Sequence, residues 1–255
     1  MIKILGLGTY PVSNPQGGGQ FRVRAIQQCL RDAEIDYHYF CVCHNHFPGE
    51  KPDASMSAIV DAKVLENALR ARSYEGGNLW PRDINNDILV DVHDAALPIL
   101  ETNCALMRSL HDAAQNLDPH FIQIEQHGMI EVALHLIAAG ITPNARIIYS
   151  GQNDEAALYR NIMYKDSTPW TRYSHMRASA MEKLAIQNAA LIFAVTQEDA
   201  TSYAQHTDKP IVVACNGSAT HAASVKAQTD WADRCEGFSR YMVFVSSAQI
   251  IGNMR

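Results

Sequence analysis

The hydrophobic positions alternate between short, nearly continuous apolar runs and longer segments in which apolar residues recur every three or four positions. Such short runs are typical of strands buried on both faces of a parallel sheet, and the longer segments are typical of amphipathic helices. We expect strands at Ile2–Leu7, Ile35–Cys43, Ile88–Val92, Phe121–Glu125, Arg146–Ser150, Leu191–Thr196, Ile211–Cys215 and Tyr241–Ser246. The alternation predicts an α/β fold, a Rossmann-like doubly wound parallel sheet of about seven strands with helices on both faces.

Several of the segments between these strands have a helical period. Asp94–Asn116 carries the clearest apolar stripe, Trp170–Asn188 carries a similar one, and Ile130–Ala139 is short, apolar and followed by glycine. A weaker stripe predicts a helix over Ala54–Arg72. The Gly- and Pro-containing segment Ser73–Asn86 predicts a loop.

Composition and charge exclude several classes of protein. The chain has 255 residues, of which 47% are hydrophobic and 19% charged, as in an ordinary globular protein. Its net charge of -6, without a cluster of Lys and Arg, argues against a nucleic-acid partner. The longest apolar stretch, near Ala189–Val195, is far shorter than the about 20 residues that cross a bilayer. The six cysteines form no Cys-x-x-Cys pair, so we expect reduced thiols in a cytoplasmic protein.

Three consecutive glycines follow the first predicted strand. Gly17, Gly18 and Gly19 open the first helix after a long loop, and Gln20 and Arg22 come directly after them. Backbone N–H groups at a helix N-terminus bind anions, so this segment is a candidate phosphate site. The alternative is a flexible turn followed by a solvated arginine. The spacing does not match a dinucleotide fingerprint, which argues against a nicotinamide cofactor.

Polar residues follow several predicted strands at the carboxyl edge of the sheet, where open α/β sheets bind ligands. His127 and Glu125 end one strand, Asn153 and Glu155 follow the next, and Thr196 ends another. His127 can face a substrate or form a hydrogen bond at a helix start, and Glu125 can orient His127, bind hydroxyl groups or be a buried, paired carboxylate. Asn153 and Glu155 can bind a ligand or cap the next helix, and for Glu155 we favour capping.

The segment Cys41-Val-Cys43-His44-Asn-His46 contains zinc-binding residue types. On a strand, Cys41 and Cys43 point to one face and His44 to the other, so the spacing favours buried cysteines and loop histidines. We therefore predict no metal site. A Gly-x-Ser-x-Gly elbow is also missing from the sequence, which argues against a serine hydrolase.

Taken in order, these segments resemble the N-terminal domain of GT-B glycosyltransferases, in particular the retaining enzymes of family 4. Gln152 stands where that family frequently has histidine. The similar segments are the Gly-Gly-Gly loop with Arg22, Asp118–His127, Arg146–Glu155, Ala190–Asp199, Pro210–Gly217 and Tyr241–Ser247.

The resemblance implies that residues 1–236 form the acceptor-side, Rossmann-like N-terminal domain and that residues 237–255 begin a truncated C-terminal donor-binding domain. The implied enzyme transfers a hexose from a nucleotide diphosphate sugar to a saccharide or lipid-linked acceptor with retention, without cofactor or metal. Its implied partners are the nucleotide sugar donor, a saccharide or glycolipid acceptor and its own missing C-terminal domain. The implied location is cytoplasmic or peripheral at the inner face of the membrane, and we expect the fragment alone to be inactive.

The resemblance also implies roles for the candidate residues. His127 and Glu125 would be catalytic, with His127 facing the sugar. The implied binding residues are Gly17, Gly18, Gly19, Gln20 and Arg22 for the donor phosphates, and Asn153, Glu155 and Thr196 on the acceptor side. Two other functions stay open: a non-catalytic sugar- or nucleotide-binding module, and a sugar epimerase of GT-B type.

Overall fold

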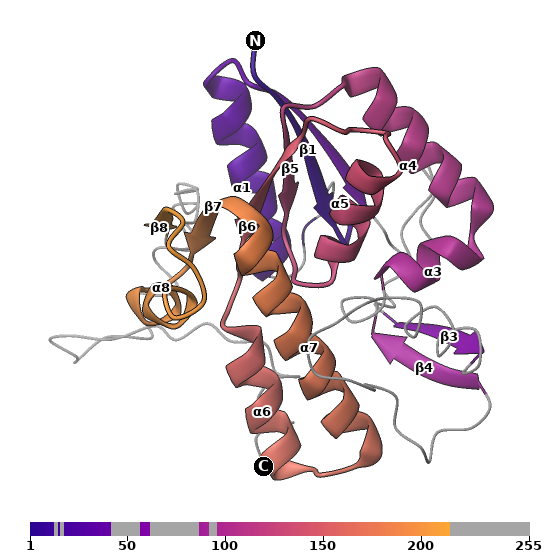
Figure 1. Ribbon diagram of the computed structural model, residues 1–255, viewed down its shortest axis with the longest axis vertical. Helices are drawn as coiled ribbons and strands as arrows, with labels where there is room; N and C mark the ends of the chain where they lie inside the picture. Colours follow the sequence, from indigo (N-terminus) through magenta and orange to yellow (C-terminus); the bar gives the residue numbers. More distant parts are fainter. Residues whose placement is uncertain (13–14, 16–17, 42–56, 62–86, 92–95, 215–255) are drawn as a thin grey trace, which may run out of the picture.

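The computed structural model describes residues 1–12, 15, 18–41, 57–61, 87–91 and 96–214. A parallel sheet of six strands lies at its centre, in the order β2-β1-β5-β6-β7-β8 (Figure 1). The strands are β1 (Lys3–Gly8), β2 (Asp36–Cys41), β5 (Phe121–Ile124), β6 (Arg146–Ser150), β7 (Ala189–Ala194) and β8 (Ile211–Val213). The predicted α/β fold with a Rossmann-like parallel sheet is confirmed.

Helices cover both faces of this sheet (Figure 1). They are α1 (Gly18–Asp32), α3 (Ala96–Thr102), α4 (Cys104–Leu117), α5 (Met129–Ala138), α6 (Glu155–Lys165), α7 (Pro169–Asn188) and α8 (Gln197–Tyr203). The main core contains Leu7 and Ile124 of the sheet together with buried side chains of α4, α5 and α7. On the opposite face, Val23 of α1 packs against Tyr10 and Tyr39. No helix in the described ranges has the length and apolar character that crossing a membrane requires.

The strand order reverses between β1 and β5. From β1 the chain passes outward to β2, and from β5 it continues in the other direction to β8. At such a reversal the connections leave the two central strands on opposite faces of the sheet, which opens a crevice at their carboxyl ends. The topology therefore places a candidate site beyond Gly8 and Ile124.

Two predictions about the segment between β2 and α3 are wrong. The strand predicted at Ile88–Val92 forms as β4 (Asp87–Asp91), but it pairs antiparallel with β3 (Ser57–Asp61) in a separate sheet. Residues Ser57–Asp61 in turn lie within Ala54–Arg72, where we expected a helix. Both strands carry two β-branched residues within five positions, which favours strand pairing over a weak helical stripe. The main sheet therefore has six strands in the described residues, close to the predicted number of about seven.

The helix predicted over Asp94–Asn116 is interrupted at Asn103. Its Oδ1 accepts a hydrogen bond from the backbone N–H of Leu106 at 3.1 Å, so α3 ends and α4 begins there. Asparagine competes for backbone donors in this way, which is why it favours helix starts over helix interiors.

The other two predicted helices are confirmed with shifts of about one residue. The segment Ile130–Ala139 forms α5, and Gly140, which follows it, has a φ of 72°. Glycine adopts this left-handed conformation without a steric penalty, which is why it commonly ends helices. Trp170–Asn188 forms α7, which Thr168 caps with a reciprocal pair of hydrogen bonds to Thr171.

Several predictions lie outside the described residues and stay predictions. They concern the loop Ser73–Asn86, the cysteine–histidine segment from Cys43 to His46, Gly17, the strand Tyr241–Ser246 and the domain boundary between residues 236 and 237.

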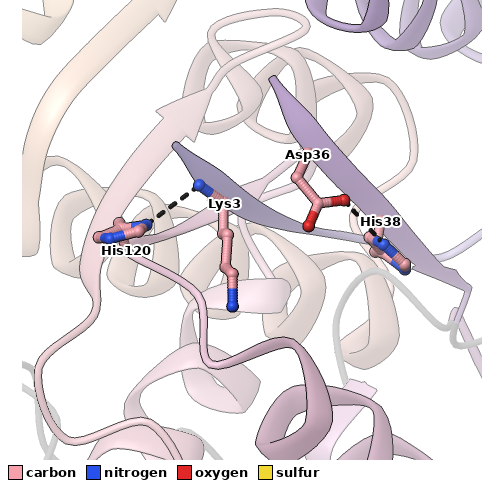
Figure 2. Close-up of polar contacts among 4 residues, drawn as sticks. All are labelled: Lys3, Asp36, His38 and His120. Atoms are coloured by element: carbon pink, nitrogen blue, oxygen red, sulfur yellow. Dashed lines mark hydrogen bonds and ion pairs between the residues drawn. The ribbon is translucent and has the colours of Figure 1, made fainter. Parts of the chain in front are cut away.

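Polar contacts fix the amino ends of β1, β2 and β5 (Figure 2). The backbone N–H of Lys3 donates to Nδ1 of His120 at 3.0 Å, and Nε2 of His38 lies 3.0 Å from Oδ1 of Asp36. His120 therefore lies at the opposite end of β5 from His127, which makes it a suitable control position for substitutions of His127.

Candidate active site

The carboxyl ends of β1, β5 and β6 bring three residues into one row. Gly8, Glu125 and Ser150 occupy neighbouring register positions on the face covered by α1. The backbone N–H of Glu125 still bonds to β1 at 3.0 Å. A β-carbon on Gly8 would overlap the hydroxyl group of Tyr39, so glycine is required where the tyrosine crosses the strand. The row forms the floor of the crevice that the topology predicts.

Glu125 is a fully buried carboxyl group in this row. One of its oxygens, Oε1, accepts a hydrogen bond from Nε2 of Gln123 at 2.6 Å. Burial raises the pKa of Glu125 to about 7, against the opposing effects of hydrogen bonds from Gln123 and Ser150 and of the charge of Arg22. Glu125 can therefore gain or lose a proton near neutral pH, which is a property common at functional sites.

The loop after β1 closes over this row through Tyr10. Nε2 of Gln152 donates a hydrogen bond to the Tyr10 hydroxyl group, and the hydroxyl group of Tyr39 donates to the Tyr10 carbonyl at 2.9 Å. The backbone N–H of Thr9 donates to Oε1 of Gln126 at 3.0 Å. Burial raises the pKa of Tyr10 far above its usual range, so the phenol stays neutral. A side chain from β2 and side chains from the segments that follow β5 and β6 thus hold one loop in place.

The two described glycines at the start of α1 have different surroundings. Among the described residues, a β-carbon on Gly18 would meet nothing within 4 Å, whereas one on Gly19 would overlap the side chains of Tyr10 and Gln152. Gly19 is therefore needed for close packing of α1 against the loop.

Gln20 and Arg22 both turn inward. Nε2 of Gln20 donates to the carbonyl of Pro11 at 3.0 Å, which ties α1 to the preceding loop. Arg22 is only 5% exposed, and its Nη1 donates to the carbonyl of Ala214 at 2.8 Å. The structure therefore does not show the solvated arginine that the sequence left as an alternative. It places a positive charge beneath the first turn of α1, close enough to lower the pKa of Glu125.

His127 lies directly beyond β5 and is 1% exposed. Its ring meets the ring of Tyr159 edge-on, with centroids 6.0 Å apart. Glu182 of α7 is an electrostatic neighbour. Burial raises the pKa of Glu182 to about 7, while the backbone N–H groups of Ala156 and Glu155 and the charge of His127 act in the opposite direction. A second buried carboxyl group thus lies near the histidine.

The N-terminus of α6 already holds two carboxylates of the protein. Glu182 accepts hydrogen bonds from the backbone N–H of Glu155 at 3.1 Å and of Ala156 at 2.9 Å. Asp154 caps the helix through a 2.8 Å bond from Ala157. Helix N-termini attract anions, and here the chain itself supplies them. The start of α6 is therefore occupied by carboxylates of the protein itself.

The three residues expected on the acceptor side all take part in local contacts. Nδ2 of Asn153 donates to Glu155 at 3.2 Å, and the helix cap is Asp154, one residue before Glu155. Thr196 caps α8, where it exchanges hydrogen bonds with Asp199. Of the three, only Thr196 is a helix cap, and the capping role that we favoured for Glu155 is wrong because Asp154 takes it. A binding role for the three residues stays a prediction.

Sequence reasoning missed several residues of this cluster. Gln123 and Glu125 alternate with isoleucine in a buried strand, and two polar residues on one face of such a strand were a usable signal. Tyr10 gave no comparable signal, and Gln152 was noted only for its place in the family resemblance, because each lies in a loop and they meet only through the fold. Glu182 looked like one of many polar residues on a surface helix.

Comparison with known proteins adds no family to this description. The sequence matches no protein-family model and no curated protein. Within the described ranges, no group of three or more His, Cys, Asp or Glu side chains could hold a metal ion. The resemblance to glycosyltransferases therefore rests on the residues of this chain alone.

Proposed function

We propose that this chain contains the acceptor-side domain of a retaining glycosyltransferase of GT-B architecture. The observation that carries the proposal is the position of the polar cluster. Tyr10 and Glu125 lie where the strand order reverses, Tyr10 packs against Gly19 in the first turn of α1, and His127 follows Glu125 by two residues. Ligands of open parallel sheets bind at this point.

The charges in the crevice suit a phosphate-bearing donor. Backbone N–H groups at Gly18 and Gly19 and the buried charge of Arg22 would stabilise the diphosphate as it leaves the sugar. His127, at the end of the neighbouring strand, would lie beside the transferred hexose. In the proposed reaction the anomeric carbon loses its bond to the phosphate oxygen and gains one to the acceptor oxygen, and the hydroxyl proton passes to the leaving diphosphate. A second domain would complete the donor site.

A binding and transfer experiment tests the proposal. Uridine diphosphate glucose is added to the 15N-labelled chain, and we expect amide shifts at Gly18 and His127 but not at His120. With labelled nucleotide sugars and saccharide acceptors, the longer protein that includes a donor domain should form a glycoside with the anomeric configuration of the donor.

The matched variants are His127→Ala and His120→Ala, at opposite ends of β5. We expect the first to abolish transfer and the second to preserve it. Binding without transfer would instead support a non-catalytic module, and a changed sugar configuration without transfer would support an epimerase. A crevice that binds neither nucleotide sugars nor saccharides would refute all three functions.

A further inference from the structure

Two histidines from different helices meet on the face of the sheet that α4 and α5 cover. Nε2 of His111 lies 3.1 Å from Nε2 of His135, and the planes of the two rings differ by only 18°. We propose that these two residues, the α4–α5 histidine pair, bind a divalent transition-metal ion such as Zn²⁺ through both Nε2 atoms. The pair lies outside the crevice, so this binding does not depend on the proposed function.

Both histidines lie toward the amino edge of the sheet. The helix α5 begins after the carboxyl end of β5 and ends before β6, and His135 belongs to its last turn. His111 is in the second half of α4, the helix that leads to the amino end of β5. The crevice opens at the opposite, carboxyl edge, so an ion at the pair and a ligand in the crevice would not compete.

The main core holds the two helices that carry the pair. Leu110 precedes His111, Leu136 follows His135, and both leucines are fully buried members of this core. The histidines themselves are only partly buried. The backbone beneath each ring is therefore fixed, while the rings stay accessible to water and ions. A site that is preorganised in this way loses little conformational freedom when an ion binds.

The spacing of the two nitrogens suits a shared ion. Zinc binds imidazole nitrogen at about 2.0–2.1 Å, so two imidazoles at a tetrahedral angle hold their nitrogens roughly 3.3–3.4 Å apart. The observed separation is 3.1 Å, and a small rotation of the rings supplies the difference and turns both lone pairs toward the ion. At this separation one ring can donate its Nε2 proton to the other in the free protein. Metal binding moves that proton to Nδ1 of the same ring, so the imidazole stays neutral.

The charges around the pair favour a cation, and the ligand type selects which one. The carboxyl end of a helix carries a partial negative charge, and His135 lies in the last turn of α5. Imidazole nitrogen suits Zn²⁺, Ni²⁺ and Cu²⁺, whereas Mg²⁺ and Ca²⁺ prefer oxygen ligands. In the described part of the chain no third His, Cys, Asp or Glu completes the set. Water would fill the remaining positions, so the affinity should be lower than that of a zinc site with four protein ligands.

Isothermal titration calorimetry with zinc chloride, on protein first freed of metal by a chelator, tests the site. The wild type should bind one zinc ion for which the affinity falls at least about tenfold in His111→Gln and in His135→Gln, because a single imidazole no longer chelates the metal. The matched control is His175→Gln, which changes a partly buried histidine of α7 whose Nδ1 lies 3.3 Å from Oγ of Ser179 in the same helix. This control should bind zinc as the wild type does. Copper should bind more tightly than zinc, and magnesium chloride should give no heat of binding.

Every other outcome overturns the proposal. Zinc binding that survives both substitutions would place the ion elsewhere, for example on the segment Cys41–His46, and a wild type that binds no zinc would exclude the site directly. If a variant fails to fold, 15N NMR of the imidazole nitrogens of the wild type replaces it. Zinc should then shift the Nε2 resonances of His111 and His135 together and leave those of His175 in place. Resonances of the pair that do not move would refute the proposal.

Discussion

Glu125→Gln should make the protein more stable at high pH and leave its stability unchanged at low pH. The substitution keeps the shape of the side chain, and the new amide oxygen can still accept the hydrogen bond from Gln123. What it removes is the negative charge that Glu125 acquires when it loses its proton. The stability difference between the two proteins therefore reports the burial of that charge.

The magnitude follows from the pKa of Glu125, which is 4.5 without the fold and about 7 with it. As the pH rises between these values, the unfolded chain releases the proton while the folded protein retains it, so the wild type loses stability. The whole interval corresponds to about 3 kcal/mol. Below a pH of about 4.5 the two proteins should be equally stable, and above about 7 the glutamine variant should be more stable by about this amount.

Urea unfolding followed by circular dichroism, repeated across this pH range, measures the difference. The control is Glu198→Gln, which removes an exposed carboxyl group and should leave the pH dependence close to that of the wild type. A difference between Glu125→Gln and the wild type that stays constant with pH would refute the reasoning. So would a wild type that gains stability relative to the variant as the pH rises.

Three further substitutions test other parts of the structure. Arg177→Met leaves Glu131 buried without the partner that now lies 3.0 Å away, so chemical denaturation should show a loss of about 3–5 kcal/mol. Adding Glu131→Met should restore most of this loss, and a double variant as unstable as the single one would contradict it. Gly19→Ala should destabilise the protein by about 1–3 kcal/mol by overpacking, whereas Gly18→Ala should change the midpoint little, and equal effects would contradict the packing of α1. Asp154→Ala should lower stability by about 1 kcal/mol through loss of a helix cap, measured by thermal unfolding, and an unchanged midpoint would contradict that role.

The pattern of short apolar runs predicted the parallel sheet well. Each of its six strands in the described residues coincides with a predicted strand. It failed where the choice between helix and strand depended on a distant partner. Ser57–Asp61 has a weak helical stripe, but pairing with Asp87–Asp91 across an intervening segment determines its conformation. A side chain that competes for backbone donors, as at Asn103, also has no periodic signature.

For the candidate site, the sequence predicted the edge of the sheet and several of its residues, but not their partners. Glu125 and His127 were expected to act together, whereas the structure holds Glu125 through Gln123 and places the carboxyl group of Glu182 near His127. The residue types were visible in the sequence. Which of them meet depends on loops and helices that only the complete fold brings together.

The hydrogen bond from Arg22 to Ala214 joins residues 192 positions apart. Closing a loop of this length is entropically costly, and contacts between such distant residues slow folding. During synthesis, the first strands and α1 emerge well before the last strand that Arg22 needs. The other elements of the crevice can therefore form early. The guanidinium group of Arg22 reaches its final position only when β8 joins the sheet. The charge balance around Glu125 is thus one of the last features of the site to form.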